Sequence, residues 1–413
     1  MSHENLAPRR LAAVVLLPFG LAYFLSYGLR NINALIAGTL MTELDIGASQ
    51  LGLLTGVLFL AMAVVQLPLG VALDRYGPRR VQSFLLLFVA VGAVITSMAS
   101  SITGLLSGRI LIGIGTSTCL MAGLKAIVLT APPLRIARAN GILIMLGASG
   151  AIAVTAPADG LMAIFGWRGL FQLAAVLAIA MAALIITVAP ERHQSNTHRP
   201  SAPVKLSTIY ADPRFQALAP LSALTIGASW SLQGLWAGPW LTHVAGLDQA
   251  SVVNNLLIIG IALALGAAGL GWITDRLKAR GSDREIVLVA IAGASLTAMV
   301  VLVLQLPVSP FIPWSVIAVA GAATTVSYAI LPGYFAVTMS ARANAALNLL
   351  HLLTAFGVQA AIGAFIDQWP KTNGHPPAEA HQAALGSVAV LQALALTWFV
   401  VARRRCIVPV LTV

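Results

Sequence analysis

The sequence has few of the residues on which catalytic and disulfide-bonded proteins depend. Of its 413 residues, 9% are charged and only 13 are Asp or Glu. The two cysteines, Cys119 and Cys406, provide neither a disulfide framework nor a metal-ligand spacing. The seven histidines are scattered, and no Ser/His/Asp triad, metal-spaced cluster or nucleotide-binding loop is recognisable. The sequence therefore predicts no enzyme, no metal site and no cofactor.

Apolar residues are abundant instead, and they make up 59% of the chain. A soluble domain needs more polar surface than the remainder can supply. The formal charge of +11 raises the question of a nucleic-acid partner, but the basic residues lie in short loops and are not gathered on one soluble face. We therefore expect the lipid bilayer to be the main partner, and no nucleic acid.

Long apolar runs divide the chain into membrane spans, each of which needs about 20 residues. The first run begins near Leu11 and, at about 28 residues, is too long for the core of a signal peptide, so it is predicted to be a retained membrane helix. The sequence predicts an all-α polytopic membrane protein with twelve transmembrane helices. The predicted spans are residues 11–38, 49–73, 81–99, 103–131, 139–164, 168–189, 213–241, 249–273, 285–305, 313–336, 344–368 and 383–402.

One connection stands out by its length and polarity. Residues 191–212 are rich in polar residues, Ser and Pro, and they are predicted to be a cytoplasmic linker between six-helix bundles at residues 1–190 and 213–413. Lys and Arg are retained on the cytoplasmic side of membranes, and nineteen of the 24 fall on one side of this topology. We therefore expect a multi-pass plasma (inner) membrane protein with both termini in the cytoplasm. We also expect the protein to be functional as a monomer.

A short motif occurs twice, at matching positions of the two predicted bundles. Gly-x-x-x-Asp-Arg begins at Gly70, after the second span, and again at Gly271, after the eighth. Glycine lets two helices approach, and charged residues at helix ends interact with helix dipoles and with one another. The candidate gating residues in these loops are Gly70, Asp74, Arg75, Arg79, Arg80, Asp275 and Arg276.

This repeat resembles the signature loop of the major facilitator superfamily, of which the second copy is a degenerate form. Arg109, Gly113 and Gly115 match that family's helix 4 motif, and Gly166-Trp-Arg-Gly-Leu-Phe171 resembles its turn before helix 6. The resemblance covers essentially the whole chain. It implies two six-helix pseudo-repeats and a transporter that alternates between inward-open and outward-open states.

Arg30 lies within the first span, where a charged side chain costs at least about 2.5–3.5 kcal/mol. Helical spacing places Tyr23, Tyr27, Arg30 and Asn33 on one face. Acids that could neutralise the guanidinium are scarce. Arg30 is therefore predicted to be the principal contact for an anionic substrate, which it can grip with two parallel hydrogen bonds. The alternative is a structural arginine paired with a buried acid or with backbone carbonyls.

Two further cations lie in helix 4. Arg109 lies at a depth similar to that of Arg30, so the two are able to share one anion, but its motif occurs across the superfamily and favours gating or packing equally. Lys125 is predicted either to face the cavity as an inner anion contact or to extend to the cytosol. Polar or shape contacts are expected from the later helices, at Gln233, Trp236, Tyr328, Asn348 and His351.

The segment from Tyr27 to Asn33 looks like helix 1 of the organic-anion-handling branches of the superfamily. Leu29 stands where an aspartate is frequent, which removes an expected proton-coupling acid, and Asn31 replaces a lysine, which disfavours a phosphate ester. A small mono- or dicarboxylate fits best. The candidates for proton coupling are His351, because imidazole titrates near neutral pH, and Asp159.

Other functions are less consistent with the sequence. A proton-coupled multidrug exporter would use buried acids, which are scarce here, and its Gly-Pro-rich helix 5 motif is not intact around Asp159. An organophosphate or inorganic anion exchanger remains an alternative for the same arginine. A membrane-embedded receptor or enzyme has no supporting motif.

Overall fold

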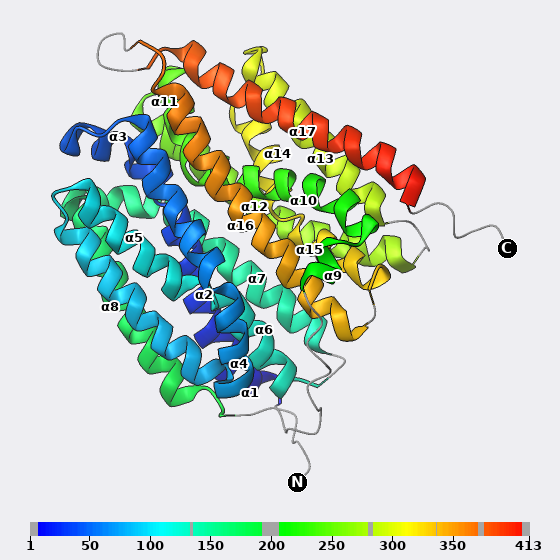
Figure 1. The fold of residues 1–413 in the computed structure, drawn as a ribbon. Coiled ribbons are helices and arrows are strands. Elements are labelled where there is room, and N and C mark those ends of the chain that lie inside the picture. Colours follow the sequence, from blue (N-terminus) through cyan, green and yellow to red (C-terminus); the bar gives the residue numbers. More distant parts are fainter. Residues whose placement is uncertain are drawn as a thin grey trace. The chain divides into compact units, whose positions relative to one another are not determined.

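The computed structural model describes residues 7–132, 135–191, 206–279, 284–335, 337–370 and 376–406. Every regular element in these ranges is a helix (Figure 1). Nine of the helices described there are long and apolar enough to cross a membrane, and one of them, Ala48–Met98, contains two of the predicted spans. Each of the twelve predicted spans coincides with helical residues, so the all-α polytopic fold class is confirmed.

The helices form two compact units. The N-terminal unit comprises residues 1–46 and 57–197, and the C-terminal unit comprises residues 47–56 and 198–413. The first half of the chain contains α1 (Pro8–Leu11), the π-helical turn η1 (Ala12–Leu16), α2 (Leu17–Asn31), α3 (Asn33–Leu44), α4 (Ala48–Met98), α5 (Ile102–Thr116), α6 (Cys119–Thr130), α7 (Ile136–Ala153) and α8 (Ala156–Val188).

The second half of the chain is also helical, as far as residue 406. Its helices are α9 (Leu206–Tyr210), α10 (Pro213–Ser231), the π-helical turn η3 (Leu232–Trp236), α11 (Ala237–His243), α12 (Gln249–Ala279), α13 (Arg284–Val303), α14 (Phe311–Gly321), α15 (Thr324–Ile330), the 3-10 turn η4 (Leu331–Gly333), α16 (Val337–Ile366) and α17 (Ala378–Cys406). Within the predicted linker, residues 192–205 lie outside the described part of the chain, so its boundaries stay a prediction.

Two of the long helices, α4 and α8, are interrupted at a glycine between one predicted span and the next. Gly77 in α4 and Gly166 in α8 have φ angles of 80° and 65°, a region that favours glycine because it has no Cβ. Gly77 belongs to the signature loop, and Gly166 begins the Gly-Trp-Arg turn. The glycines of both motifs therefore reverse the chain between consecutive spans.

The first, fourth, seventh and tenth predicted spans, here called helices 1, 4, 7 and 10, are interrupted within their length. Helix 1 breaks at Ile32 between α2 and α3, and helix 4 breaks between α5 and α6. In the second half, helix 7 contains the π-helical turn η3, and helix 10 breaks between α14 and α15. Such irregular turns occur frequently at functional sites, and in transporters they occur where substrates bind.

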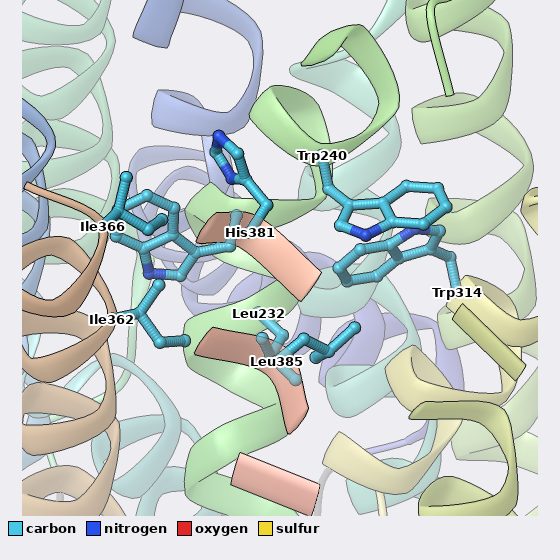
Figure 2. Close-up of a pocket in the computed structure, with 8 residues that line it drawn as sticks. Leu232, Trp240, Trp314, Ile362, Ile366, His381 and Leu385 are labelled. Carbon is cyan, nitrogen blue, oxygen red and sulfur yellow. The ribbon is translucent and has the colours of Figure 1, made fainter. Parts of the chain in front are cut away.

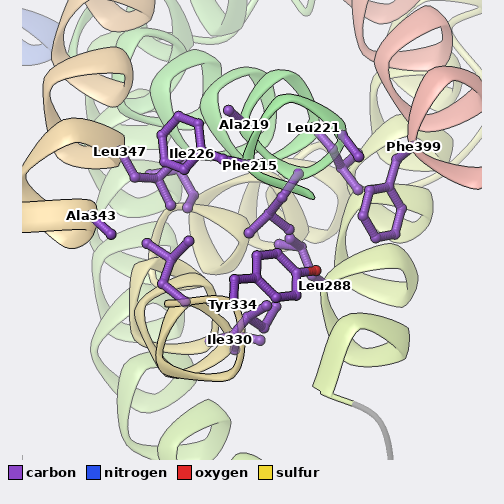
Figure 3. Packing of buried hydrophobic residues seen from close by; sticks show 14 of the residues in the cluster. Phe215, Ala219, Leu221, Ile226, Leu288, Ile330, Tyr334, Ala343, Leu347 and Phe399 are labelled. Atoms are coloured by element: carbon purple, nitrogen blue, oxygen red, sulfur yellow. The ribbon is translucent and has the colours of Figure 1, made fainter. Parts of the chain in front are cut away.

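In the C-terminal unit, a buried cluster joins several helices and the turn after α15 (Figure 3). Phe215 of α10, Leu288 of α13, Leu347 of α16 and Phe399 of α17 are each at most 1% exposed. Because lipid is as apolar as these side chains, their close packing and not their removal from water holds the helices together.

Residues 47–56, the start of α4, cluster with this unit through α16. The Asp367 carboxylate accepts hydrogen bonds from the backbone N–H groups of Ala48 and Ser49, at 3.0 and 2.7 Å. It thereby satisfies two of the donors that a helix N-terminus leaves free. Gly52 packs so closely that a Cβ there would lie 2.6 Å from the backbone oxygen of Gln359. Asp367, one of the few acids near a span, is thus a helix cap.

Close backbone packing between α2 and α7 makes a prediction for stability. A Cβ on Gly150 would lie 2.1 Å from the carbonyl oxygen of Phe24, a backbone atom that cannot move alone. We expect Gly150→Ala to lower the free energy of unfolding by about 1–3 kcal/mol, as overpacking does, and to lower the melting temperature in detergent. Gly141→Ala on the same helix is the control, because a Cβ there meets nothing within 4 Å. Equal effects of the two substitutions would contradict the packing argument.

Candidate functional site

Arg30 lies in the last turn of α2, directly before the break in helix 1. Its guanidinium carbon is 5.6 Å from the centre of the Tyr27 ring, and the rings of Tyr27 and Tyr23 meet edge to face at 5.6 Å. Tyr23 is 6% exposed and its ring packs on Gly147 of α7, where a Cβ would lie 1.9 Å from Tyr23 Cδ1. The two tyrosines therefore fix the face of α2 from which Arg30 projects.

The guanidinium of Arg30 is not neutralised by any acid in the part of the chain that the structure describes. Among the residues that the structure describes, no hydrogen bond or ion pair joins it to another side chain or to a carbonyl, and its Nε is buried without a partner. The side chain is only partly buried. An arginine in this state retains N–H donors for an external acceptor.

Arg109 of α5 has a different environment, although it is also in the membrane. It is 2% exposed, donates from Nη1 to the Leu29 carbonyl oxygen at 3.0 Å and from Nη2 to Asn33 Oδ1, and lies 5.0 Å from the centre of the Phe171 ring. Leu29 and Asn33 lie on either side of the break in helix 1. Arg109 therefore connects helix 4 to the interruption beside Arg30.

Lys125 of α6 points to the signature loop. Its Nζ donates to the Leu73 carbonyl oxygen at 2.8 Å and pairs with Asp74 Oδ1 at 2.5 Å. The sequence left open whether Lys125 faces the cavity or the cytosol. In the structure its ammonium group has two partners at the loop.

The other end of the signature loop is joined to α8. Arg79 Nε donates to the Ile186 carbonyl oxygen at 2.9 Å, and both Arg79 and Arg80 form ion pairs with Glu191. Arg75 lies 5.2 Å from the ring centre of Tyr76, and a Cβ on Gly70 would meet nothing within 4 Å. The first copy of the motif therefore fastens the loop to the ends of helices 4 and 6.

The second copy of the motif is less fully described. Arg276 lies over the Trp272 ring at 3.9 Å from its centre. The side chain of Asp275 lies outside the described side chains.

His351 of α16 is fully buried in the C-terminal unit. Its Nε2 is 2.9 Å from Ser222 Oγ of α10, which in turn donates to Ser327 Oγ of α15 at 2.9 Å. The Tyr328 ring stacks on the imidazole with 6.1 Å between centres. Asn348, one turn earlier on α16, is half-buried. Polar side chains of α10, α15 and α16 therefore meet at His351.

Gln233 and Trp236 lie in the π-helical turn η3 and are 7% and 4% exposed. Trp236 lines a small cavity of about 10 Å³ together with Trp240, Trp314, His381 and four aliphatic residues (Figure 2). Figure 2 shows the rings of Trp240 and Trp314 beside each other, with 5.9 Å between their centres. That volume holds about one water molecule, so this cavity is too small for an organic anion.

Two further acids lie at the beginning of helices in the described part of the chain. Asp159, a candidate for proton coupling, is half-buried in the first turn of α8. Glu285 was missed by the sequence reasoning because it begins a span beside basic residues. It is 4% exposed, pairs with Arg403 Nε at 2.7 Å and accepts a hydrogen bond from the Tyr334 hydroxyl. The only sequence signal was its position at the end of an apolar run.

Comparison with known proteins identifies the family. The profile of the Major Facilitator Superfamily matches residues 19–364. The chain belongs to this superfamily. This family membership is the one that the signature loop indicated.

Individual relatives cover only part of this superfamily member. A "probable L-galactonate transporter" of Escherichia coli K12 is 29% identical over 42% of this chain and 38% of its own length. A "probable sulfoacetate transporter" of Cupriavidus necator is 28% identical over 43% of this chain and 42% of its own length. The chain thus matches less than half the length of these relatives.

Among solved structures, a bacterial homologue of the human lysosomal transporter Spinster, in an inward-facing and unoccupied conformation, has a similar fold. The TM-score is 0.76 at 19% identity, over 97% of this chain and 98% of the other. At this identity the likeness shows the fold alone.

The contacts of the two helix 4 cations predict different effects on stability. Arg109→Gln leaves Asn33 and the Leu29 carbonyl without a charged donor inside the membrane, so we expect a loss of about 2–3 kcal/mol. Lys125→Gln removes an ion pair whose acid is 78% exposed, so its expected effect is below about 1 kcal/mol. Melting temperatures in detergent test this difference, and equal losses would contradict it.

Proposed function

We propose that the protein is a secondary active transporter for a small organic anion, with Arg30 as the principal contact for the anionic group. The observation that carries this proposal is the guanidinium of Arg30, which has no hydrogen-bond or ion-pair partner among the described residues. The printed names of two relatives, L-galactonate and sulfoacetate transporters, also refer to organic anions. Alternating access of the two halves is the general mechanism of such folds.

The chemistry around Arg30 favours a carboxylate or sulfonate. A guanidinium offers parallel N–H donors that match the two oxygens of such a group. The neighbours Leu29 and Asn31 add no second positive charge, which a phosphate dianion would require. Tyr23 and Tyr27 would hold the arginine in place, and Arg109 and Asn33 would maintain the helix break beside it.

The remaining site residues have proposed roles of their own. Gln233, Trp236, Tyr328, Asn348 and His351 would supply polar and shape contacts from the second half of the chain. Lys125, with Asp74, would act in gating through the signature loop. We further propose that the protein works as a monomer in the inner membrane, with both termini in the cytoplasm.

Removing the charge of Arg30 tests the anion site. At a ligand concentration of about 100 times Kd, binding stabilises a protein by about 2.7 kcal/mol. We expect galactonate or sulfoacetate to raise the melting temperature of the wild type. Arg30→Gln should abolish this increase, although the variant should remain folded in the absence of ligand. Arg30→Lys should retain part of it, because one charge remains but the paired donors are lost. Uptake of the same anions into proteoliposomes should fall in the same order.

The matched control is Arg135→Gln, which removes an exposed arginine and should leave anion stabilisation unchanged. An undiminished anion effect in Arg30→Gln would reduce Arg30 to a structural role. Stabilisation by lipophilic cations alone would favour the multidrug exporter instead, and stabilisation by nitrate or organophosphates alone would favour an exchanger for those anions.

Proton coupling is proposed to use His351, with Asp159 as the alternative. In support, His351 Nε2 has a hydroxyl partner while its Nδ1 is buried without one among the described residues. We expect His351→Asn, which keeps hydrogen-bonding capacity, to abolish the stimulation of uptake by a pH gradient while counterflow exchange persists. Ser222→Ala is the control for loss of the hydrogen bond alone. Unchanged pH-driven uptake in His351→Asn would remove this residue from the mechanism.

A further inference from the structure

The N-terminal unit contains a second candidate site, separate from Arg30. A groove of about 430 Å³ lies between the end of α3 and the glycine turn within α8. Thr39 and Glu43 line it from α3. The residues that line it from α8 are Met162, Phe165, Gly166, Trp167 and Arg168. Because both elements end or reverse here, the groove lies at the end of the membrane spans, where lipid headgroups meet water.

The polar wall of the groove is a fixed pair of opposite charges. Glu43 Oε2 accepts a hydrogen bond from Trp167 Nε1 at 2.6 Å, and Glu43 Oε1 pairs with Arg168. Arg168 also donates to the Ala99 carbonyl oxygen at 3.2 Å, and its guanidinium lies 4.2 Å from the Trp167 ring centre. The bonds from Trp167 and Arg168 hold the pKa of Glu43 below its ordinary value, so this carboxylate is charged at neutral pH.

Both charged groups remain available to a ligand. The side chains of Arg168 and Glu43 are 36% and 39% exposed. The bonds to Glu43 and Ala99 use two of the five N–H donors of the guanidinium, and each carboxylate oxygen can accept a second hydrogen bond. A ligand with an anionic and a cationic group can therefore contact the pair without breaking it.

The apolar wall of the groove is formed by Met162 and Phe165. Phe165 is 65% exposed, and its chain neighbour Ile164, which is not part of the lining, is 74% exposed. At the end of a membrane span, exposed apolar side chains such as these contact acyl chains. An apolar wall beside a paired charge matches an amphipathic ligand better than a free anion.

We propose that this groove binds the headgroup of a zwitterionic phospholipid with a primary amine, phosphatidylethanolamine. Its phosphate would accept hydrogen bonds from Arg168, its ammonium would donate to Glu43, and an acyl chain would follow Phe165 and Ile164. A choline headgroup has no N–H to donate to Glu43, and an anionic glycerol headgroup offers that carboxylate no positive charge. The site does not depend on the proposed transport function.

Native mass spectrometry of the full-length protein tests the proposal. The delipidated protein is titrated with phosphatidylethanolamine, phosphatidylcholine or phosphatidylglycerol of identical acyl chains. We expect the wild type to retain phosphatidylethanolamine about fivefold better than the other two lipids. A fivefold difference in affinity corresponds to about 1 kcal/mol, the upper range for one exposed ion pair. Glu43→Gln should remove the preference over phosphatidylcholine, and Arg168→Gln should weaken retention of phosphatidylethanolamine.

A further substitution distinguishes a loss of lipid binding from a loss of folding. Thr39→Trp fills the groove from an exposed position and leaves the Glu43–Arg168 pair intact, so it should abolish the lipid preference in a protein that melts like the wild type. Arg135→Gln, outside the groove, should keep the preference. Equal retention of the three lipids by the wild type, or an undiminished preference in Thr39→Trp, would overturn the proposal. Equally strong binding of soluble glycerophosphoethanolamine would also overturn it, because the apolar wall would then contribute nothing.

Discussion

A polar group inside a membrane must find its partners within the protein, because the lipid offers none. Two arginines of the N-terminal unit meet this constraint differently. Arg109 donates from both of its Nη atoms, to Leu29 and Asn33 at the break in helix 1, although its Nε has no partner among the described residues. Arg30, on the same break, has an aromatic ring beside it but no hydrogen-bond acceptor among the described residues. One arginine thus contacts the irregular backbone, and the other keeps N–H donors that no described residue accepts from.

The same constraint explains other features of the fold. Where a helix begins, Asp367 satisfies backbone donors of α4. Where a polar side chain is fully buried, as in His351, hydroxyl groups on two other helices connect to it. At the ends of spans the charges pair with one another, as Glu43 and Arg168 do. Apolar contact holds the helices together, but these polar contacts specify which helix faces which.

The sequence predicted much of the fold and part of the site. Runs of apolar residues located all twelve spans because span length is set by the bilayer. Gly77 and Gly166 were within motifs whose glycines turned out to reverse the chain. Partners were not predictable in the same way. Lys125 meets Asp74, 51 residues earlier, and Arg109 meets Leu29, 80 residues earlier, and neither separation leaves a periodic signal in the chain. Glu285 was overlooked because a buried acid at a span end looks like a loop residue.

By itself, the sequence determined that this protein is a polytopic membrane protein of the major facilitator superfamily, that it contains a repeated loop, and that Arg30, Arg109 and Lys125 lie within its spans. Hydropathy, motif spacing and helical period are local properties of the chain, so they can be read from the sequence without a structure. Only the tertiary structure decided which of the three cations has hydrogen-bond or ion-pair partners within the described part of the protein. That depends on the carbonyls and carboxylates that neighbouring helices bring within hydrogen-bonding distance, and the distances arise from packing between residues far apart in the chain.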